Sequence, residues 1–254
     1  MVDYNGRLSS VYAAGRGMTV DEVKRWTDAF QPHLPGERPL TLLDLGSGTG
    51  RLTPGLADAF GGPVYGVEPS DRMREIAETT AVHPDVVYRK GSAEEIPLPE
   101  ASVDGVLMFL SFHHFRDQQQ ALEEVRRVLK PGGVAFLRSQ FADLMPDLFW
   151  YDYFPSARTV DAGMYLSLDA VKSLARKAGL TPADDVVWVT TEPPRTLRES
   201  YDRLKLRALS TFEHLPEDEI EAGFARLAAD ADRDPDRRLS VHPAAMLLLS
   251  RTGS

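Results

Sequence analysis

The sequence predicts an α/β protein in which helices cover both faces of a mainly parallel β-sheet. Two observations favour this fold class. From residue 40 onward, short apolar runs alternate with amphipathic stretches, as expected when strands and helices follow one another along the chain. One apolar run leads directly into a glycine-rich turn before a helix, which is typical of ligand-binding parallel sheets.

The first segment, residues 1–38, is predicted to be helical and separate from the sheet. Its apolar side chains follow a helical stripe from Val20 to Phe30, and Thr19 is a candidate N-cap. The sequence Pro35-Gly36 is expected to end the segment, which we predict to be an N-terminal helical lid.

Residues 39–141 are predicted to form the core of the sheet. The expected strands are the apolar runs 40–45, 64–67, 86–89, 103–110 and 134–138. Helices are expected at 51–60, at 71–80 with Ser70 as the cap, and at 117–129. A Lys-Pro-Gly-Gly sequence at 130–133 predicts the turn before the fifth strand.

The last third of the chain is less regular. Residues 142–166 are rich in aromatic side chains, and we expect an irregular lid insertion there. A helix at 167–178 and a sixth strand at 185–191 are expected in a core segment spanning 167–191. A helical insertion, 192–241, should hold helices at 195–210 and 216–230, and residues 242–254 should contain a last core strand at 244–251.

Length and composition are those of an ordinary globular protein. The 254 residues are 43% hydrophobic and 26% charged, and none is a cysteine, which excludes disulfides and cysteine nucleophiles. The formal net charge of −9 disfavours binding to nucleic-acid backbones and to anionic membranes. We see no signal-peptide pattern and no apolar stretch near the ~20 residues of a membrane-spanning helix. A cytoplasmic protein is therefore expected.

The strongest functional signal is the sequence Asp44-Leu45-Gly46-Ser47-Gly48-Thr49-Gly50, directly after the first strand. Glycines at alternate positions allow the backbone to approach a ligand closely at the carboxyl end of that strand. Glu68 ends the second strand, where a carboxylate suits a bidentate hydrogen bond to ribose hydroxyls. Asp44 would repel a dinucleotide pyrophosphate but suits the ammonium group of S-adenosylmethionine. A nicotinamide dinucleotide and a glycine-rich turn without a ligand are the weaker alternatives.

These residues resemble the class I S-adenosylmethionine-dependent methyltransferases, specifically the group similar to ubiquinone/menaquinone C-methyltransferases, over about residues 40–140. The resemblance implies a Rossmann-like seven-stranded sheet, with strand seven antiparallel and a helical and aromatic lid. It implies cofactor contacts from Arg16, Asp44, Gly46, Ser47, Gly48, Gly50, Glu68, Pro69, Ser92, Ala93, Glu94 and Leu110. Arg16 would pair with the methionine carboxylate or remain a solvated charge.

His113 and His114 follow the fourth strand at its carboxyl end, where open α/β sheets bind ligands. The run from His113 to Asp117 matches a pattern that the family often carries at this place. Imidazole has a reference pKa of about 6.5, so either histidine is suited to take a proton from the methyl acceptor near neutral pH. The alternative is that both histidines only shape the pocket. A metal site is not expected.

An aromatic run at 149–154 is predicted to lie over the active site. Trp150, Asp152 and Tyr153, together with Tyr12, are the predicted substrate contacts. Aromatic faces suit a flat apolar molecule or a cationic amine, whose charge Asp152 would balance. The alternative is that these rings pack a small core of their own.

We therefore expect an enzyme that transfers a methyl group from S-adenosylmethionine to an O, N or C atom of a small-molecule metabolite by in-line displacement. Natural-product pathways use many such enzymes of this group. Sequence features of nucleic-acid methyltransferases are missing, so no nucleic-acid partner is expected. The alternative is a non-catalytic protein that binds S-adenosylmethionine or S-adenosylhomocysteine for regulation or assembly.

Overall fold

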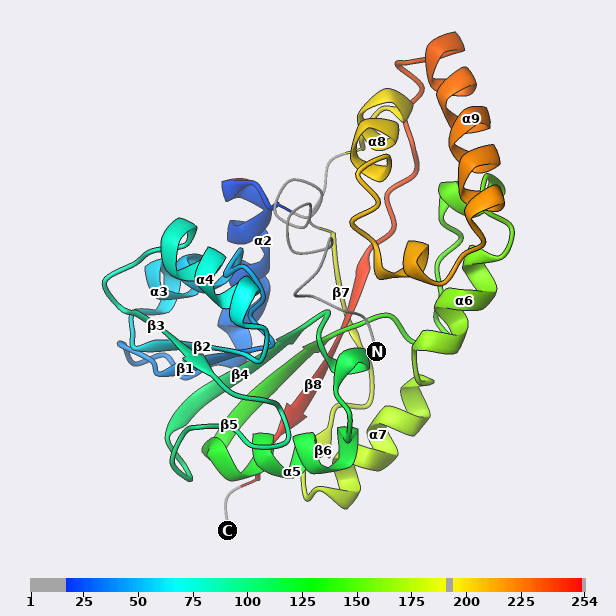
Figure 1. Ribbon diagram of the computed structural model, residues 1–254. Coiled ribbons are helices and arrows are strands. Elements are labelled where there is room, and N and C mark those ends of the chain that lie inside the picture. Colours follow the sequence, from blue (N-terminus) through cyan, green and yellow to red (C-terminus); the bar gives the residue numbers. More distant parts are fainter. Residues whose placement is uncertain (1–16, 191–193, 253–254) are drawn as a thin grey trace.

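The computed structural model describes residues 17–190 and 194–252 and contains one eight-stranded mixed sheet (Figure 1). The strands are β1 (Leu42–Leu45), β2 (Val64–Glu68), β3 (Val86–Lys90), β4 (Val103–Phe109), β5 (Leu129–Arg138), β6 (Thr181–Pro182), β7 (Val187–Val189) and β8 (Ala244–Ser250). Their order is β3-β2-β1-β4-β5-β8-β6, and β7 also pairs with β8. The first five strands are parallel, whereas β8 is antiparallel to β5, β6 and β7. The predicted Rossmann-like sheet with an antiparallel last strand is confirmed.

Strand order reverses between β1 and β4. From β1 the chain moves outward through β2 to β3, and it then returns to place β4 on the other side of β1. Ligands bind at such switch points in open α/β sheets, outside the carboxyl ends of the strands. The glycine-rich loop after β1 and the two histidines after β4 both lie at this point.

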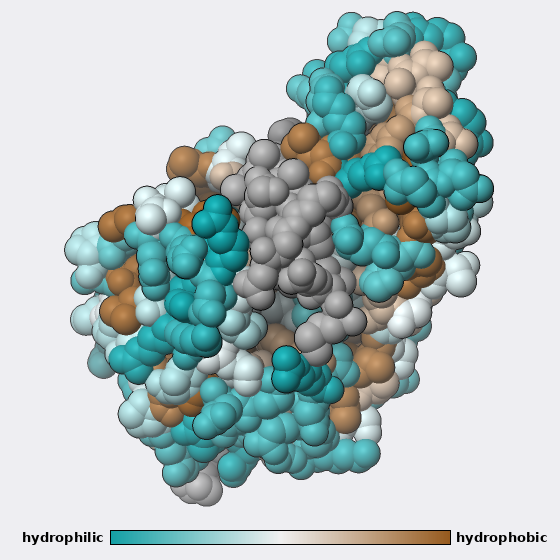
Figure 2. Space-filling view, viewed as in Figure 1, coloured by the Kyte–Doolittle hydropathy of each residue, from teal (hydrophilic) through white to brown (hydrophobic). Residues whose placement is uncertain are grey.

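Helices cover both faces of the sheet because neighbouring strand residues point to opposite sides. Leu42 packs with α2 (Val20–Phe30) and α3 (Thr53–Phe60), whereas Leu43 packs with α5 (Gln118–Val128) and α7 (Leu168–Lys177). Burial on both faces explains why β1 is a continuous apolar run. The surface over α5 is mainly hydrophilic in Figure 2, because this helix buries only one of its faces.

Helix starts follow the capping residues that the sequence predicts. Thr19 and Glu22 form a capping box at the start of α2, and Ser70 caps α4 (Asp71–Thr80) through a hydrogen bond from Met73 N. Within residues 17–190 and 194–252, none of the helices has the length and apolarity that crossing a membrane requires.

A second group of helices stands apart from the sheet and has an apolar core of its own (Figure 1). We call it the helical lobe; it comprises η3 (Phe149–Asp152), α6 (Ala157–Met164), α8 (Leu197–Leu204), η4 (Ser210–Glu213) and α9 (Glu217–Arg233). Phe154 lies at its centre, where its ring meets those of Phe212 at 5.2 Å and Phe224 at 5.0 Å, both edge-on. Much of the aromatic run therefore packs a core of its own.

Some predicted elements differ from the observed ones. The segment predicted to be irregular contains α6, an eight-residue helix that is too short to show a clear helical period. The helix predicted at 195–210 ends at Leu204 and is followed by η4, and β6 was not predicted because it has only two residues. β5 begins at Leu129 rather than residue 134, with a register shift where the predicted turn lies. The division of the chain into lid and core segments stays a prediction, and residues 1–16 lie outside the described residues.

Candidate active site

The loop after β1 passes through glycines whose backbone lies in the left-handed region. φ is +74° at Gly46, +58° at Gly48 and +74° at Gly50. A Cβ at Gly46 would lie 2.5 Å from the Cβ of Ser111, and one at Gly50 would collide with a tyrosine hydroxyl on β3. At Gly48 the nearest atom is the Cε of Met73, at 3.7 Å. Packing therefore requires the outer glycines, whereas Gly48 leaves space open in front of the loop.

Glu68 joins this loop to the end of β2. One carboxylate oxygen accepts a hydrogen bond from Gly48 N at 2.9 Å, and the other accepts one from Ser70 N at 2.9 Å. Burial raises the pKa of Glu68, while these two hydrogen bonds oppose the rise. Each carboxylate oxygen has a second lone pair, so Glu68 retains acceptor capacity for hydroxyl groups.

Asp44 lies behind the loop and is only 2% exposed. Its Oδ2 accepts a hydrogen bond of 2.7 Å from the hydroxyl of Thr53, the first residue of α3. Burial raises the pKa of Asp44 to about 6, although the Thr53 hydrogen bond and the charge of Arg51 act in the opposite direction. Asp44 thus fastens the glycine loop to α3.

A cavity of about 750 Å³ opens at the carboxyl ends of β1, β2 and β4; we call it the first cavity. Predicted cofactor residues that line it are Gly46, Gly48, Glu68, Pro69, Ser92, Ala93, Glu94 and Leu110. Asp44, Ser47 and Gly50 are not among its lining residues, and Arg16 lies outside the described residues. The contacts of these four residues with the cofactor stay a prediction.

Glu94 fixes the far end of the first cavity. Its Oε1 accepts hydrogen bonds from the backbone amides of Arg116, at 2.7 Å, and Asp117, at 3.3 Å. Burial acts to raise the pKa of Glu94, but hydrogen bonds from backbone amides and from Ser92 lower it overall. The loop after β3 is thereby tied to the start of α5.

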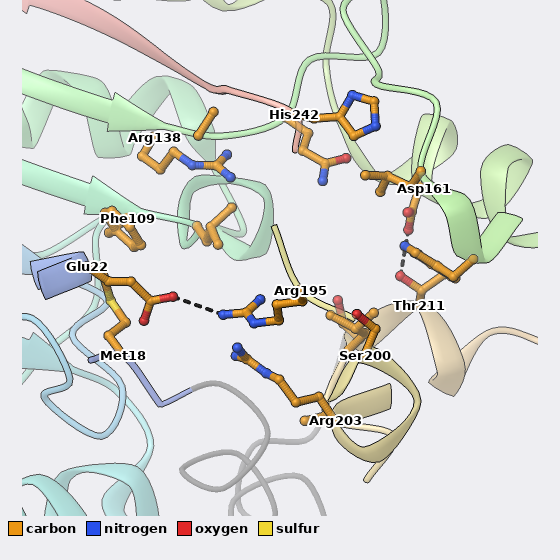
Figure 3. Close-up of a pocket in the computed structure, with 18 of the residues that line it drawn as sticks. Met18, Glu22, Phe109, Arg138, Asp161, Arg195, Ser200, Arg203, Thr211 and His242 are labelled. Carbon is orange, nitrogen blue, oxygen red and sulfur yellow. Dashed lines mark hydrogen bonds and ion pairs between the residues drawn. The ribbon is translucent and has the colours of Figure 1, made fainter. Parts of the chain in front are cut away.

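A second cavity, of about 380 Å³, lies between the sheet and the helical lobe (Figure 3). Trp26, Phe109 and Arg138 line it from the sheet side, and Trp150 and Asp161 from the lobe. Of the predicted substrate residues that the structure describes, Trp150 lines one of these two cavities.

The other predicted substrate residues lie elsewhere. Asp152 is exposed and lines neither cavity. Tyr153 points into the helical lobe, where its hydroxyl donates a 2.8 Å hydrogen bond to Asp230 on α9. The contact of Asp152 and Tyr153 with the substrate stays a prediction, and the packing of the lobe core decides the direction of the Tyr153 side chain. Tyr12 lies outside the described residues.

Phe109, Leu110, His113 and His114 line both cavities; we call these four residues the shared wall. The rings of His113 and His114 have centroids 3.8 Å apart, and the ring of Tyr165 lies 4.7 Å from that of His113. Both histidines are half-buried. Each of the two cavities is thus lined by both imidazole rings.

Leu110 turns the chain from β4 toward the histidines with a strained backbone. Its φ is +57°, which is rare for a residue with a branched side chain. Its backbone amide donates to the carbonyl of Arg138 at 2.8 Å, which holds this conformation against the end of β5. Strain of this kind is often found at functional sites.

Several residues of the second cavity were not singled out from the sequence. They are Glu22, Arg138, Tyr165, Asp161, Arg195 and Arg203. Arg138 is the last residue of β5, so the rule that ligands bind at carboxyl ends of strands applies to it as well. No three His, Asp or Glu side chains in the described part of the chain lie close enough together to hold a metal ion.

The first cavity fits S-adenosylmethionine. Gly48 leaves room at the loop, the carboxylate of Glu68 has acceptor capacity for hydroxyl groups, and Ala93 contributes a small side chain to the lining. S-adenosylmethionine carries no phosphate group, so its binding requires neither a phosphate site at a helix N-terminus nor a lysine that binds phosphate. The residues present therefore suit a nucleoside without phosphate groups.

Comparisons with known proteins agree with this interpretation. Residues 43–137 match the family model described as "Methyltransferase domain". The 27-O-demethylrifamycin SV methyltransferase of Amycolatopsis mediterranei is 31% identical over 213 residues, which are 81% of this chain and 77% of that protein. The demethylmenaquinone methyltransferase of Chlorobaculum parvum is 32% identical over 132 residues, which are 51% of this chain and 54% of that protein.

A solved structure from Anabaena variabilis, described as a methyltransferase from an antibiotic biosynthesis pathway, has the same fold. It superposes with a TM-score of 0.74 and 27% identity, covering 89% of this chain and 96% of that one. The cofactor of such enzymes is S-adenosylmethionine, as the geometry of the first cavity indicates. The chain belongs to the class I S-adenosylmethionine-dependent methyltransferases, in the group similar to the quinone C-methyltransferases.

Proposed function

We propose that this enzyme methylates a hydroxyl oxygen of a small molecule bound in the second cavity, and that His113 or His114 takes the hydroxyl proton. The shared wall is the observation that carries the proposal, because it brings the imidazole rings to the one place where both cavities meet. The first cavity is the cofactor site in this proposal.

The residues of the first cavity hold and orient the cofactor. Glu68 accepts the ribose hydroxyls, Gly48 lets the loop backbone approach, and Ser92 and Ala93 lie along the base. When bound, S-adenosylmethionine supplies a methyl carbon on a sulfonium sulfur, a leaving group that needs no proton. The chain itself therefore has only one proton to move, that of the acceptor.

The histidines are suited to that proton transfer. Neutral imidazole accepts a proton near neutral pH, and the half-buried position of both rings limits competition from water. The tilted ring of Tyr165 packs against His113 and restricts its orientation. Oxygen as the acceptor atom is supported by the rifamycin relative, whose name specifies an O-methyl position.

Placing a tryptophan side chain in one cavity at a time tests the proposal. Ser210 lines only the second cavity and Ala93 only the first. Transfer of label from methyl-labelled S-adenosylmethionine to a panel of phenols and hydroxy acids would be measured alongside calorimetric binding of S-adenosylhomocysteine. Ser210→Trp should abolish transfer and leave the affinity for S-adenosylhomocysteine unchanged, whereas Ala93→Trp should abolish both. Full transfer by a folded Ser210→Trp variant would show that the acceptor binds elsewhere.

A further inference from the structure

We propose that the methyl acceptor is a neutral, polyhydroxylated aromatic compound, with one hydroxyl group at the shared wall and a second one held by Ser200 and Ser210 of the helical lobe. The inference rests on the proposed function, since it takes the second cavity as the acceptor site. It goes further in naming the charge of the acceptor, the arrangement of its hydroxyl groups and the residues that select it.

Ser200 presents a hydroxyl group to the second cavity from within a helix. It lies on α8, lines the cavity and is only 8% exposed, and Figure 3 shows it on the lobe side, opposite Phe109. A serine inside a helix often donates to the carbonyl four residues earlier. Neither that hydrogen bond nor any other joins the Ser200 hydroxyl to the described residues, and protein atoms do not enclose its oxygen. The hydroxyl is therefore available to a ligand.

Ser210 places a second hydroxyl on the same side of the cavity. It begins η4, is half-buried and lines the second cavity but not the first. Its hydroxyl likewise makes no hydrogen bond with the described residues. The neighbouring Thr211, in contrast, donates its hydroxyl to Asp161 at 2.6 Å, which holds η4 against α6. The backbone at Ser210 is therefore held in place while its hydroxyl remains available.

Gln140 supplies a third neutral polar group, from the sheet side. It follows the last residue of β5 by two positions and lines the second cavity. Its Oε1 is buried without a hydrogen-bond donor, and its amide makes no other hydrogen bond with the described residues. A buried polar atom is rarely left without a partner, because its desolvation is then uncompensated. Rotation about the last side-chain bond, which is broad and nearly two-fold, can turn either end of the amide toward a ligand.

These three side chains share a chemistry that matches hydroxyl groups better than charged groups. A serine hydroxyl and a glutamine amide can each both donate and accept hydrogen bonds. A hydroxyl group on a ligand also donates and accepts, so it can use both capacities at once. A carboxylate only accepts and an ammonium group only donates. The neutral polar groups of the wall therefore favour a hydroxylated acceptor.

The charged side chains of the wall do not decide the charge of the acceptor. Glu22 pairs with Arg195 at 2.9 Å. Asp161 accepts a 2.8 Å hydrogen bond from the hydroxyl of Tyr151 in addition to the one from η4. A carboxylate oxygen has two lone pairs, so such groups can also accept from a ligand, whether its donor is a hydroxyl or an ammonium group. The discrimination thus depends on the neutral polar groups.

The rest of the cavity wall suits a flat ring. Trp26 and Phe109 line it from the sheet side, and their rings meet edge-on with centroids 4.8 Å apart. Phe149 and Trp150 line it from the lobe. Aromatic faces bind planar apolar bodies, and the few polar groups of such a site fix the orientation of the ligand. A ring between these side chains would direct one hydroxyl to the histidines and another to the serines.

Four naphthalenes that differ at one position test the inference. The parent 2-naphthol and its derivatives with a hydroxyl, a carboxylate or an aminomethyl group at carbon 7 would be titrated by calorimetry into the full-length protein saturated with S-adenosylhomocysteine. We expect the diol to bind about tenfold more tightly than 2-naphthol and than either charged derivative, because only the diol matches both serine hydroxyls.

Variants of the two serines show whether they cause this preference. In a Ser200→Ala and Ser210→Ala double variant, the advantage of the diol over 2-naphthol should fall below about twofold, with unchanged affinity for S-adenosylhomocysteine. Ser210→Thr keeps a hydroxyl group and should retain the preference. Ser156→Ala is the matched control, because this serine of the helical lobe is exposed and lines neither cavity. A change in the ratio of the two affinities distinguishes recognition of the second hydroxyl from a general loss of structure.

The outcomes separate this inference from the proposed function. If S-adenosylhomocysteine binds but the diol has no advantage, if a charged derivative binds more tightly, or if none of the four compounds binds, the acceptor belongs to another class and the cofactor site stands. A preference for the diol that persists in the folded double variant would also overturn the assignment to Ser200 and Ser210. Failure of S-adenosylhomocysteine to bind would instead overturn the proposed function.

Discussion

The backbone amide of Gly48 donates a 2.9 Å hydrogen bond to Glu68, and this contact joins the loop after β1 to the end of β2. Gly48 lies in the loop after β1, Glu68 is the last residue of the neighbouring strand β2, and both line the first cavity. Glu68 therefore orders the glycine loop and also lines the cavity that we propose as the cofactor site.

Glu68→Ala should weaken binding of S-adenosylhomocysteine by about 1–3 kcal/mol, the range for leaving polar partners without hydrogen bonds. The change removes the ribose acceptor and also leaves Gly48 N and Ser70 N without their acceptor. Calorimetry measures the affinity directly. Glu75→Ala, on the exposed side of α4, is the matched control and should bind normally. Equal affinity of Glu68→Ala and wild type would remove Glu68 from the cofactor site.

Gly48→Val should abolish binding of S-adenosylhomocysteine, because a branched side chain would enter the first cavity and would also strain a φ of +58°. Gly132→Val separates these two causes. Gly132 has a φ of +80° and no neighbouring atom within 4 Å of its Cβ position, and it lies away from both cavities. Calorimetry should show normal affinity for this control, whatever its loss of stability. Loss of binding in both variants would point to backbone strain alone.

Asp44 should make the free energy of unfolding depend on pH. Its pKa is raised from 3.8 to about 6 in the folded protein, mainly by burial, so the folded state binds the proton more tightly than the unfolded state does. This contribution to stability is full below about pH 4 and is lost as pH rises to about 6, an effect on the order of 3 kcal/mol.

Asp44→Asn tests this dependence, because an amide can still accept the hydrogen bond from Thr53 but does not titrate. Urea unfolding between pH 4 and pH 7 should show the variant gaining stability relative to wild type up to about pH 6 and then remaining level. A difference in unfolding free energy that stays constant over this range would contradict the raised pKa.

Replacing the histidine that we propose as the base by Gln should lower kcat by roughly 10²–10⁴-fold, with little change in cofactor affinity. The pH–rate profile of that variant should also lose its acidic limb. Two interchangeable bases would give mild single variants of His113 and His114 and a severe double variant. His83→Gln, at a histidine that lines neither cavity, should leave kcat unchanged. A double variant with wild-type kcat would exclude both residues from proton transfer.

Deleting residues 244–254 should destroy the cooperative unfolding of the protein, because β8 pairs with β5 on one side and with β6 and β7 on the other. Leu247 is fully buried in this strand, and Leu247→Ala alone should cost about 2–5 kcal/mol. Thermal unfolding measures both effects. Removal of residues 252–254, which leaves β8 intact, is the control and should have little effect. A folded, active 244–254 deletion would show that β8 is dispensable.

Local sequence determined the parallel sheet and the cofactor side of the site. Strands buried on both faces are continuous apolar runs, so β1, β2 and β4 are visible without knowledge of their partners. The glycines at alternate positions specify a left-handed turn within a few residues, and Glu68 is placed by the end of its own strand. Family resemblance added the antiparallel direction of the last strand, which the structure confirms.

Only the tertiary structure decided the acceptor side. Glu22 and Arg195 are 173 positions apart in the sequence and meet at 2.9 Å, a pairing that no local pattern encodes. Tyr153 was predicted to face the substrate, but Asp230, 77 positions away, holds its hydroxyl inside the helical lobe. An aromatic run shows that side chains will be buried, yet the packing of distant helices determines which of them face a cavity and which fill a core. For the same reason the arginines of the second cavity became recognisable as a group only when the lobe was placed against the sheet.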